Sequence, residues 1–305
     1  MKKHAFLVLA HKQPQLLARI LQRLERPNHH FFIHVDLKYP NLKEYYSVCR
    51  NIQNIHFVSN NIEVYHAGIS IVYAEILLLQ EADKQKEKFD FYHLISGQDY
   101  PIRSNNQFDE FFEQTDHSFM YIDSKELQKE LANNYKICAN RFHFNNTEKW
   151  YSKIYEKFHL HYFSYLWYNR DHIDNYIGGW QWFSWNYTVK EYVMQYINKQ
   201  PQYIEKYNHT SSPDEHIFTT LLAPHAQDLH IEIQNPLRYI SWHPHRDVNT
   251  KYRPYDLTEE DLPWIINSKA FFCRKVDQYH SSLLLDRIDR QRENDFDINE
   301  HNNFV

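Results

Sequence analysis

Glycine is scarce in this sequence, with only 4 residues among 305. The phosphate-binding loops of dinucleotide-binding and Walker-type proteins need closely spaced glycines, because their backbone must approach the phosphates. The chain contains no such loop. If a nucleotide binds, other residues must hold its phosphates.

Cysteine is also scarce. Cys49, Cys138 and Cys273 make an odd number without close spacing, which indicates neither a disulfide framework nor a cysteine zinc motif. A reducing compartment suits this composition best.

The sequence lacks an excess of positive charge and a long apolar run. The formal net charge is -5, whereas proteins that bind a phosphate backbone present a basic face, so we expect no nucleic-acid partner. The N-terminal apolar run stops at His11. It is too short for a signal peptide or a membrane-spanning helix and is interpreted as a first strand.

Metal-binding motifs are missing too. No Asp-x-Asp lies at a predicted strand end, since DFD at 295–297 falls in the tail, and no His-Glu-x-x-His occurs. The 21 histidines include HLH at 159–161 and HPH at 243–245. We interpret these as exposed or core histidines and expect no metal.

Aromatic residues are abundant, at 17% of the chain, while 42% hydrophobic and 24% charged residues are typical of a soluble globular protein. A chain of this length can bury a substantial core, and we expect one compact unit. Aromatic side chains suit sugar-binding clefts as well as cores.

The first third alternates predicted strands and helices, which is typical of an α/β protein with a mostly parallel, doubly wound, Rossmann-like sheet. Ligands of such sheets bind outside the carboxyl ends of the strands. This rule draws attention to His11, Asp36, the loop after Ser59 and Asp99, although Asp99 can also be a turn aspartate. The predicted strands are 4–10, 29–36, 55–59, 89–96 and 117–123, and the predicted helices are 13–24, 41–50, 69–83 and 105–112.

The second half is less regular. Residues 124–177 are rich in aromatic residues and indicate an irregular binding insert or a helical cap. The segment GGWQWFSWN at 178–186 either lines a cleft with Trp180 and Trp182 or forms a hairpin core. We further expect a helix at 188–198, a strand at 231–243, a helix within 261–277 that is followed by Arg274 and Lys275, and a tail that is helical to about Arg292.

The segment SSPDEHIFTTLL at 211–222 places Glu215 at the start of a predicted helix. Ser212 or Asp214 can serve as its N-cap, and Pro213 suits its first turn. The helix dipole favours the carboxylate, whereas burial under aromatic side chains would raise its pKa, and together these effects can leave a general base. Alternatively, the two acidic residues only decorate a helix start.

Transfer of a sugar from a nucleotide diphosphate sugar needs a base for the acceptor hydroxyl and positive charge for the departing diphosphate. Glu215 can supply the base. Because no Asp-x-Asp is available to hold Mg²⁺, the late cations Arg253, Arg274 and Lys275 are the substitutes. The alternative is that these residues form a solvated basic face.

The sequence resembles the core-2/I-branching β-1,6-N-acetylglucosaminyltransferase and peptide O-xylosyltransferase family over about residues 4–277. The resemblance implies a GT-A fold, a UDP-sugar donor, inversion at the anomeric carbon and no required metal. It rests on segments in the family's order, which are HKQPQLLARILQRL with HVDLK, HAGISIVYAEILLL, FYHLISGQDYPI, GGWQWFSWNYTVKEYV, SSPDEHIFTTLL, LRYISW and FFCRKVD.

The resemblance also assigns roles to individual residues. Glu215 matches the family's catalytic base, and Lys275 matches a cation that holds the diphosphate. Asp36 is similar to an aspartate that contacts uridine, and Trp242 is similar to a tryptophan that packs on the acceptor sugar. Further candidates are Arg253, with Lys251 as the alternative, for the diphosphate; Val8, His11, Ser96 and Asp99 for the donor; and Asp123 and Arg141 for the acceptor.

We therefore expect a single GT-A catalytic domain at 1–280, followed by a C-terminal helix and polar tail at 281–305. Residues 1–120 would bind the nucleotide, and 121–280 would bind the acceptor and return to the phosphates. The expected reaction transfers GlcNAc, ahead of xylose or glucose, from a UDP-sugar to a carbohydrate hydroxyl.

The expected setting is cytoplasmic, with peripheral association at the inner membrane face if the acceptor glycan is lipid-linked. Two other functions compete with the transferase. One is a non-catalytic glycan-binding module on the same scaffold, and the other is a histidine-rich metal hydrolase.

Overall fold

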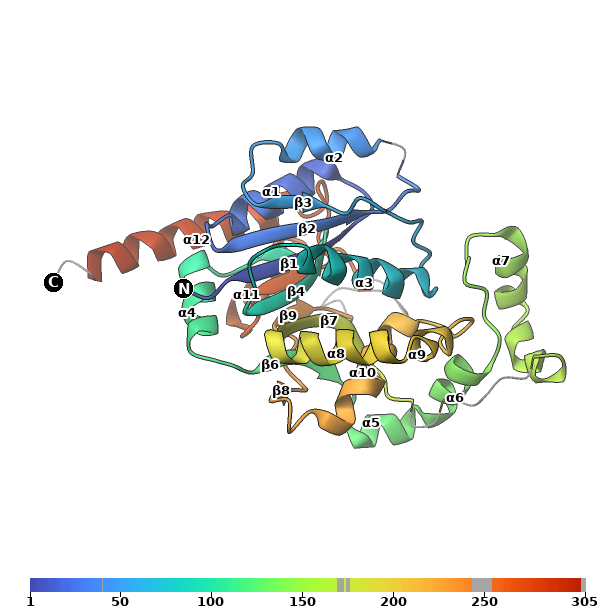
Figure 1. Cartoon of the computed structure of the whole chain (residues 1–305). Helices are drawn as coiled ribbons and strands as arrows, with labels where there is room; N and C mark the ends of the chain where they lie inside the picture. Colours follow the sequence, from blue (N-terminus) through green and yellow to red (C-terminus); the bar gives the residue numbers. More distant parts are fainter. Residues whose placement is uncertain (40, 169–172, 174–175, 243–253, 303–305) are drawn as a thin grey trace.

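The computed structural model describes residues 1–39, 41–168, 173, 176–242 and 254–302. Its centre is a seven-stranded sheet with the order β3-β2-β1-β4-β7-β6-β8, in which only β7 runs antiparallel to its neighbours. The predicted α/β class with a mostly parallel sheet is therefore confirmed (Figure 1). The strands are β1 (His4–Ala10), β2 (His29–Val35), β3 (Ile55–Phe57), β4 (Phe91–Ser96), β6 (Ser118–Ile122), β7 (Gly179–Asn186) and β8 (Ile231–Glu232).

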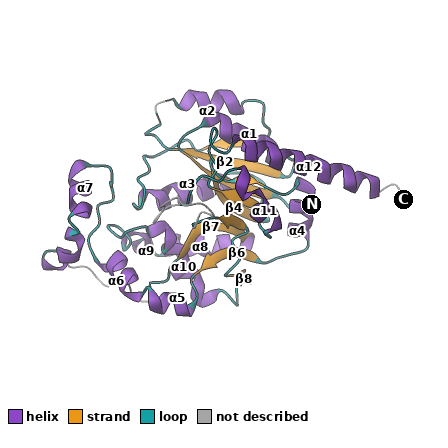
Figure 2. Ribbon diagram, turned by 180° about the vertical axis from the view of Figure 1, so that it is seen from behind, coloured by secondary structure: helices purple, strands orange, loops and turns teal. Residues whose placement is uncertain are grey.

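Helices cover both faces of the sheet (Figure 2). Strand β1 shows why, because its side chains are buried on both sides, with Phe6 and Val8 in one core and Leu7 in the other. The first core contains α1 (Pro14–Leu24), α2 (Leu42–Cys49), α4 (Asn105–Glu113) and α12 (Ser282–Asn302), and the second contains α3 (Ser70–Asp83), α8 (Tyr187–Lys199), α9 (Gln202–Glu205) and α10 (Ile217–Leu222).

A second, three-stranded sheet lies beyond the carboxyl end of β4. In it β10 (Phe272–Arg274) pairs antiparallel with β5 (Tyr100–Pro101) and parallel with β9 (Arg238–Ile240). Only residues 97–99 separate β4 from β5, so β10 is held next to the end of β4. The helical segments η4 (Glu259–Asp261) and α11 (Leu262–Asn267) precede β10.

The prediction of one strand over 231–243 is wrong. Two short strands, β8 and β9, replace it, because Pro236 has no N–H to donate to a sheet and Leu237 adopts a left-handed φ of 56°. The HPH motif at 243–245 lies outside the described residues, as do Lys251 and Arg253.

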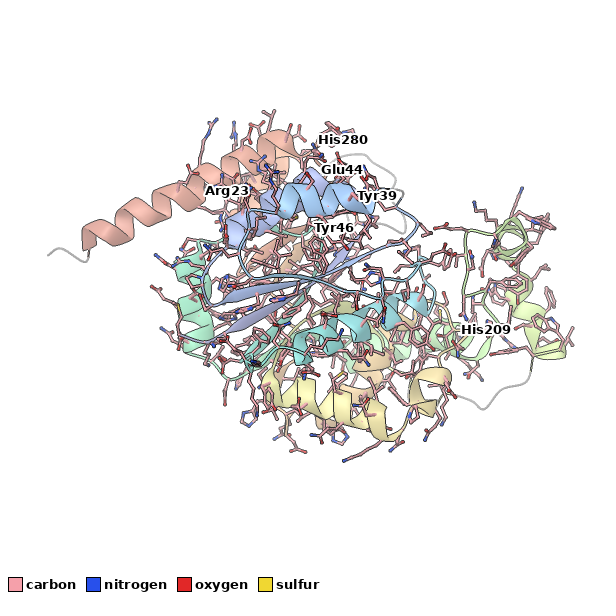
Figure 3. The ribbon with its side chains drawn as sticks, turned by 45° about the horizontal axis from the view of Figure 1, so that its top comes forward. Arg23, Tyr39, Glu44, Tyr46, His209 and His280 are labelled. Atoms are coloured by element: carbon pink, nitrogen blue, oxygen red, sulfur yellow. The ribbon has the colours of Figure 1, made fainter. Side chains whose placement is uncertain are left out.

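The C-terminal helix extends further than predicted, since α12 continues past Arg292 to Asn302. Its first half belongs to the main core, with Leu284, Leu285 and Ile288 buried. Arg23 on α1 reaches Asp289 at 2.8 Å (Figure 3). Residues 281–292 therefore pack as part of the main body of the protein.

The aromatic insert is a helical cap. It contains α5 (Lys125–Glu130), α6 (Ala132–Asn140), α7 (Trp150–Lys157) and the 3₁₀ segment η1 (Leu160–Leu166). Figure 1 shows α7 projecting away from the sheet, to one side of the body.

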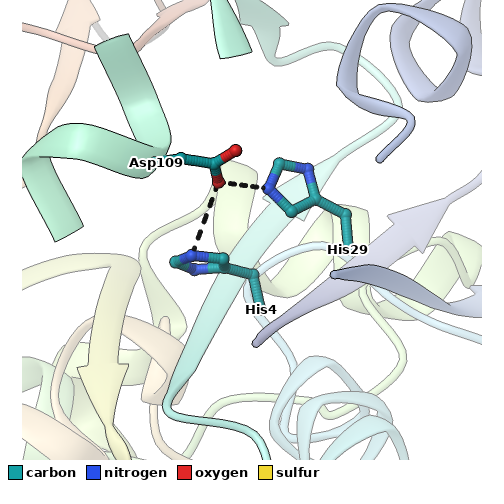
Figure 4. A group of neighbouring side chains, drawn as sticks. All are labelled: His4, His29 and Asp109. Atoms are coloured by element: carbon teal, nitrogen blue, oxygen red, sulfur yellow. Dashed lines mark hydrogen bonds and ion pairs between the residues drawn. The ribbon is translucent and has the colours of Figure 1, made fainter. Parts of the chain in front are cut away.

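Buried histidines pack at the amino ends of the strands (Figure 4). His29 contacts Leu24 O at 2.6 Å through Nδ1 and Asp109 Oδ1 at 2.8 Å through Nε2. Both ring nitrogens of His29 thus face oxygen acceptors. His4 lies on the other side of the carboxylate, with Nε2 3.7 Å from Asp109 Oδ1 and Nδ1 3.0 Å from His93.

Candidate active site

Two loops that are far apart in the sequence hold each other at the carboxyl end of β4. We call the pair, residues 96–99 and 274–277, the clasp. Val276 N donates to Gln98 O at 3.1 Å, and Gln98 Nε2 donates to Val276 O at 3.1 Å. Gln13, before α1, donates to Asp277 at 2.5 Å. The clasp fixes the backbone on both sides of Lys275.

Asp99 is a part of the clasp and has no access to a ligand. Its side chain is fully buried, and Oδ2 accepts hydrogen bonds from Ser96 N at 2.8 Å and from Arg274 Nη1 at 2.9 Å. The prediction of Asp99 as a donor-binding residue is corrected accordingly. Ser96 is also buried, and its hydroxyl donates to Asp99, so it too supports the loop.

Arg274 lies between the two sheets. Its guanidinium carbon is 3.8 Å from the centroid of the Trp182 ring, and burial lowers the pKa of Arg274 while Asp99 opposes that shift. A charge that is this enclosed needs the carboxylate beside it. Arg274 is therefore a structural cation, whereas Lys275, which follows the end of β10, is partly exposed.

Residues predicted for the donor come together beside Lys275. His11 follows β1, reaches solvent and interacts electrostatically with Lys12, Lys275 and Asp36. Desolvation of its ring and the positive charges of Lys12 and Lys275 lower the pKa of His11 to about 4. The imidazole is neutral at physiological pH and can accept a hydrogen bond there.

Asp36 follows β2 and is mostly buried. Its Oδ1 accepts hydrogen bonds from Lys38 N at 2.9 Å and from Val64 N at 3.2 Å, which ties the loop after Ser59 to the end of β2. Its Oδ2 lies 3.7 Å from Lys38 Nζ. Only Oδ2 is free of backbone contacts, so a uridine contact would use that oxygen.

Val8 does not reach this edge. Its side chain is fully buried in the centre of β1 and packs in the first core, so it lies outside the candidate site.

Glu215 ends a 3₁₀ turn, η2 (Pro213–Glu215), that precedes α10. Ser212 takes the predicted N-cap position of this turn and Pro213 follows it, but the predicted side-chain cap is absent. Ser212 adopts a left-handed conformation with φ 48°, and Asp214 is inside the turn. The Glu215 side chain is half-buried, while Asp214 beside it is buried.

Three carboxyl groups surround this turn. Burial raises the pKa of Glu215, and the charges of Asp214 and Asp123 raise it further. Burial also raises the pKa of Asp214 and of Asp123. The α6 residue Tyr135 donates its hydroxyl to Asp123 Oδ2. The helical cap thus covers Glu215 with polar groups.

A fourth carboxyl group near this turn, Glu75 on α3, was not predicted from the sequence. It is fully buried, accepts a hydrogen bond from Gln181 Nε2 at 2.5 Å, and has a pKa well above the usual range because of burial and the Asp214 charge. Within the described part of the chain, Glu75 Oε2 and Asp214 Oδ1 have no hydrogen-bond partner. A single acid within the apolar run SIVYAEILLL was the signal that could have revealed it.

Gly178 allows the cap to close on the turn. A Cβ at this position would lie 2.4 Å from Asp123 Oδ2 and 2.4 Å from the Tyr135 hydroxyl. The predicted close approach of backbone at the GG pair is therefore present.

The tryptophans of 178–186 lie on the central strand β7, which pairs with β4 and β6 and is not part of a hairpin. Trp185 is fully buried against Phe183, and Trp182 is buried over Arg274. Trp180 is half-buried and stacks on Tyr121 with centroids 4.6 Å apart, and Trp242 is exposed. Trp180 and Trp242 thus keep accessible ring surface for a sugar.

Arg141 lies at the end of α6 and packs over the ring of Tyr165 in η1, at 4.8 Å. The structure places it with α7 and η1, where it interacts with His161. It has no recorded interaction with the carboxyl groups around Glu215.

Strand β7 connects the two halves of the site. Consecutive residues Gln181 and Trp182 contact Glu75 near the Glu215 turn and Arg274 in the clasp, respectively. Arg238 supports the same region from β9, since its buried guanidinium donates to Leu94 O at 2.6 Å and Phe183 O at 3.1 Å, where β4 and β7 stop pairing.

Among the described residues, two groups have the spacing of metal ligands. They are His4, His29 and Asp109 at the amino ends of β1 and β2, and Asp116, His117 and His230 before β6 and β8. Neither includes Glu215, Asp36 or a clasp residue.

The geometry can be compared with known proteins. The family described as Branch, Core-2/I-Branching enzyme, matches residues 4–266. A probable beta-1,3-galactosyl-O-glycosyl-glycoprotein beta-1,6-N-acetylglucosaminyltransferase 7 of Sus scrofa is 32% identical over 107 residues, which are 33% of this chain and 24% of that protein. Xylosyltransferase 1 of Rattus norvegicus is 22% identical over 312 residues, covering 93% of this chain and 35% of that protein.

The chain spans only a quarter to about a third of the length of these two relatives. Among solved structures, the galactosyltransferase LgtC in complex with donor and acceptor sugar analogs has a TM-score of 0.45 and 11% identity, with 95% of each chain covered. Mouse xyloside xylosyltransferase 1 has a TM-score of 0.36 and 8% identity, over 84% of this chain and 95% of that chain. By the family match over residues 4–266, the chain belongs to the core-2/I-branching enzyme family.

Proposed function

We propose that this protein is an inverting, metal-independent glycosyltransferase. It transfers a sugar, GlcNAc ahead of xylose or glucose, from a UDP-sugar to a carbohydrate hydroxyl and forms a β-linkage. The observation that carries the proposal is the placement of a half-buried carboxyl group with a raised pKa, Glu215, on a site whose donor side presents Lys275.

Glu215 acts as the general base. The acceptor oxygen attacks the anomeric carbon from the face opposite the nucleotide, its proton passes to the carboxylate, and the bond from carbon to the phosphate oxygen breaks to release UDP. A carboxylate with a raised pKa is a stronger base than an ordinary glutamate, so burial favours this step. The negative charges of Asp214 and Asp123 raise the pKa of Glu215 further and so favour the same proton transfer.

Lys275 meets the charge that develops on UDP. The clasp and the Arg274–Asp99 pair position it, which means that little reorganisation is needed when the phosphate bond breaks. Arg253 is the second proposed cation. Because positive side chains take the place of a divalent ion, activity in EDTA should equal activity without it, and an absolute need for Mn²⁺ would contradict the proposal.

The choice of donor sugar in this proposal depends on the relatives rather than on the site. The relatives named above carry the words acetylglucosaminyltransferase and xylosyltransferase, which is why these sugars lead. Purified protein should hydrolyse one member of a UDP-sugar panel faster than the others, and this assay needs no acceptor.

The decisive variant is Glu215→Gln. It keeps the shape of the side chain but removes the base, so turnover should fall by about 10²- to 10⁴-fold while UDP affinity stays unchanged. Glu205→Gln, on the exposed end of α9, is the matched control and should keep full turnover. Normal turnover of Glu215→Gln would remove Glu215 from this role, and absence of any turnover in the wild type would favour a glycan-binding module.

A further inference from the structure

The helical projection at 149–167, which we call the arm, exposes an unusual amount of apolar surface. Ten of the large hydrophobic side chains that the described residues expose lie in it, and Trp150, Leu166 and Phe158 are 72%, 71% and 63% exposed. A contiguous exposed patch of this kind marks an interaction site. The other members are Tyr151, Ile154, Leu160, Tyr162, Phe163, Tyr165 and Trp167.

Some of these side chains pack at the base of the arm, where Trp167 contacts Phe142 and Tyr151 contacts Phe144. Phe158, Phe163 and Leu166 are among those that stay mostly exposed. The inner face of the arm is packed by Phe142 and Tyr155, and the Tyr155 hydroxyl donates to Phe142 O at 3.0 Å. Ser164 Oγ donates to His161 O at 2.8 Å and accepts from Phe142 N at 3.0 Å, which joins η1 to the base of α7. The mostly exposed side chains are therefore available for a partner.

The outer face of α7 carries an apolar stripe next to a basic stripe. Trp150, Ile154 and Phe158 recur every four residues and form one exposed stripe. Lys149, Lys153 and Lys157 recur with the same spacing one position earlier, so a basic stripe runs beside the apolar one. Among the described residues none of these lysines has an ion pair, although Lys157 lies 5.9 Å from the Phe158 ring.

Glu156 is an acidic residue of the arm itself and Glu148 directly precedes it, and both contact basic side chains. Glu156 contacts His143 at 3.2 Å and His161 at 3.4 Å, and Glu148 pairs with Lys38 beside Asp36. The arm thus presents positive charge on a chain whose net charge is -5. Exposed aromatic residues next to lysines are typical of segments that lie in the interface of an anionic bilayer.

A second copy of the chain fits this surface less well. In a two-fold symmetric contact the same patch meets itself, which would bring two basic stripes together without acidic partners. No helix among the described residues is long and apolar enough to cross a bilayer. Any contact of the arm with a membrane would be confined to its surface.

We propose that the arm docks this protein on membranes that contain anionic phospholipid, with the aromatic side chains in the interface and the three lysines facing the headgroups. The base of the arm joins the candidate site directly, since His143 N donates to His209 O and Ser211 N donates to Cys138 O. His209 is labelled at this junction in Figure 3. Docking would bring the acceptor side of the site to the membrane surface.

The test is sedimentation of the full chain with phospholipid vesicles. The protein should bind vesicles that contain one third phosphatidylglycerol, and should bind pure phosphatidylcholine vesicles at least about tenfold more weakly. Replacing the three lysines by serine should weaken binding roughly fivefold per lysine at low salt. The triple variant F158S, F163S and L166S should lose at least about tenfold at any salt concentration.

Matched control variants test whether vesicle binding depends on the arm or on exposed lysines and apolar residues in general. Tyr279→Ser with Leu283→Ser removes equally exposed apolar side chains at the start of α12, and Lys43, Lys86 and Lys199 replaced by serine remove three exposed lysines elsewhere. Both controls should bind vesicles as the wild type does. Equal binding of arm variants and controls would overturn the proposal.

Light scattering without lipid provides the second readout. The wild type should be monomeric, and a dimer that F158S, F163S and L166S converts to monomer would identify the arm as a subunit interface instead. Membrane docking does not depend on the proposed transferase activity, because every readout here is binding.

Discussion

Arg274 Nη1 lies 2.9 Å from Asp99 Oδ2, in a place where the Asp99 side chain has no solvent exposure. The pair joins β10 to the end of β4, and the residue next to it, Lys275, is the proposed diphosphate ligand. The sequence alone predicts that both Arg274 and Asp99 can bind a ligand. The structure shows that they bind each other.

Breaking this pair should destabilise the protein. Asp99→Asn leaves the enclosed guanidinium without a counter-charge, and we expect the free energy of unfolding to fall by about 3 to 5 kcal/mol in urea titrations. Asp90→Asn is the control, because Asp90 accepts a hydrogen bond from Lys3 N at an exposed position and its loss should cost less than about 1 kcal/mol. Equal effects of both variants would show that the pair has no special importance.

Adding one methyl group at Gly178 should displace the cap from Glu215. Gly178→Ala collides with Asp123 and Tyr135, so we expect a loss of roughly 1 to 3 kcal/mol in stability together with reduced turnover. At Gly97 a Cβ would meet only Lys12 O, at 4.0 Å, so Gly97→Ala should leave both quantities close to wild type. If Gly178→Ala were as active as Gly97→Ala, the contact between cap and turn would be unimportant for turnover.

The pH dependence of turnover should report the charge of Asp123. Its negative charge raises the pKa of Glu215, and the base works only when deprotonated. Asp123→Asn therefore should lower the pKa of Glu215 and move the acid limb of kcat/KM to lower pH. The test is to measure kcat/KM against pH for wild type and variant with saturating donor. If the acid limb of the profile does not move, a group other than Glu215 controls it.

Acid should weaken the fold through the buried histidines. Burial and the neighbouring His29 lower the pKa of His4 to about 3, from 6.5 for the unfolded chain, so the unfolded state binds more protons between these values. Asp109 acts in the same direction, because the His29 hydrogen bond lowers its pKa although burial opposes this. Stability should fall as pH decreases, by roughly 1.4 kcal/mol per pH unit for each group in its range.

The variant His4→Gln should make this decline shallower. Urea titrations at several pH values between 7 and 4 would measure the slope. Exposed His280, labelled in Figure 3, supplies the control, and His280→Gln should keep the wild-type slope. An unchanged slope in His4→Gln would assign the acid sensitivity to other groups.

Periodicity located most of the regular elements. The helix expected at 13–24 is α1 (Pro14–Leu24), and the strand expected at 4–10 is β1 (His4–Ala10). These elements are long and strongly patterned, so local signals suffice. The order of the strands along the sheet, and the clasp, depend on contacts between distant segments and could not be read locally.

The site was only partly predictable for the same reason. The role of Asp99 depends on Arg274, which lies 175 positions away. Glu75 was overlooked because an acid in an amphipathic helix is ordinarily solvent-exposed, whereas Gln181 and Asp214 enclose this one. The capping rule located Ser212, but this residue has a left-handed backbone and makes no side-chain cap.

The clasp also bears on biosynthesis. Gln13 and Asp277 meet across 264 positions of the chain, so the second loop is synthesised long after the first. Until β10 has been synthesised, Asp99 at the end of β4 lacks its partner Arg274. The nascent polypeptide can collapse around β1, β2 and β4 early, but the clasp that positions Lys275, the proposed diphosphate ligand, can form only after β10 has emerged.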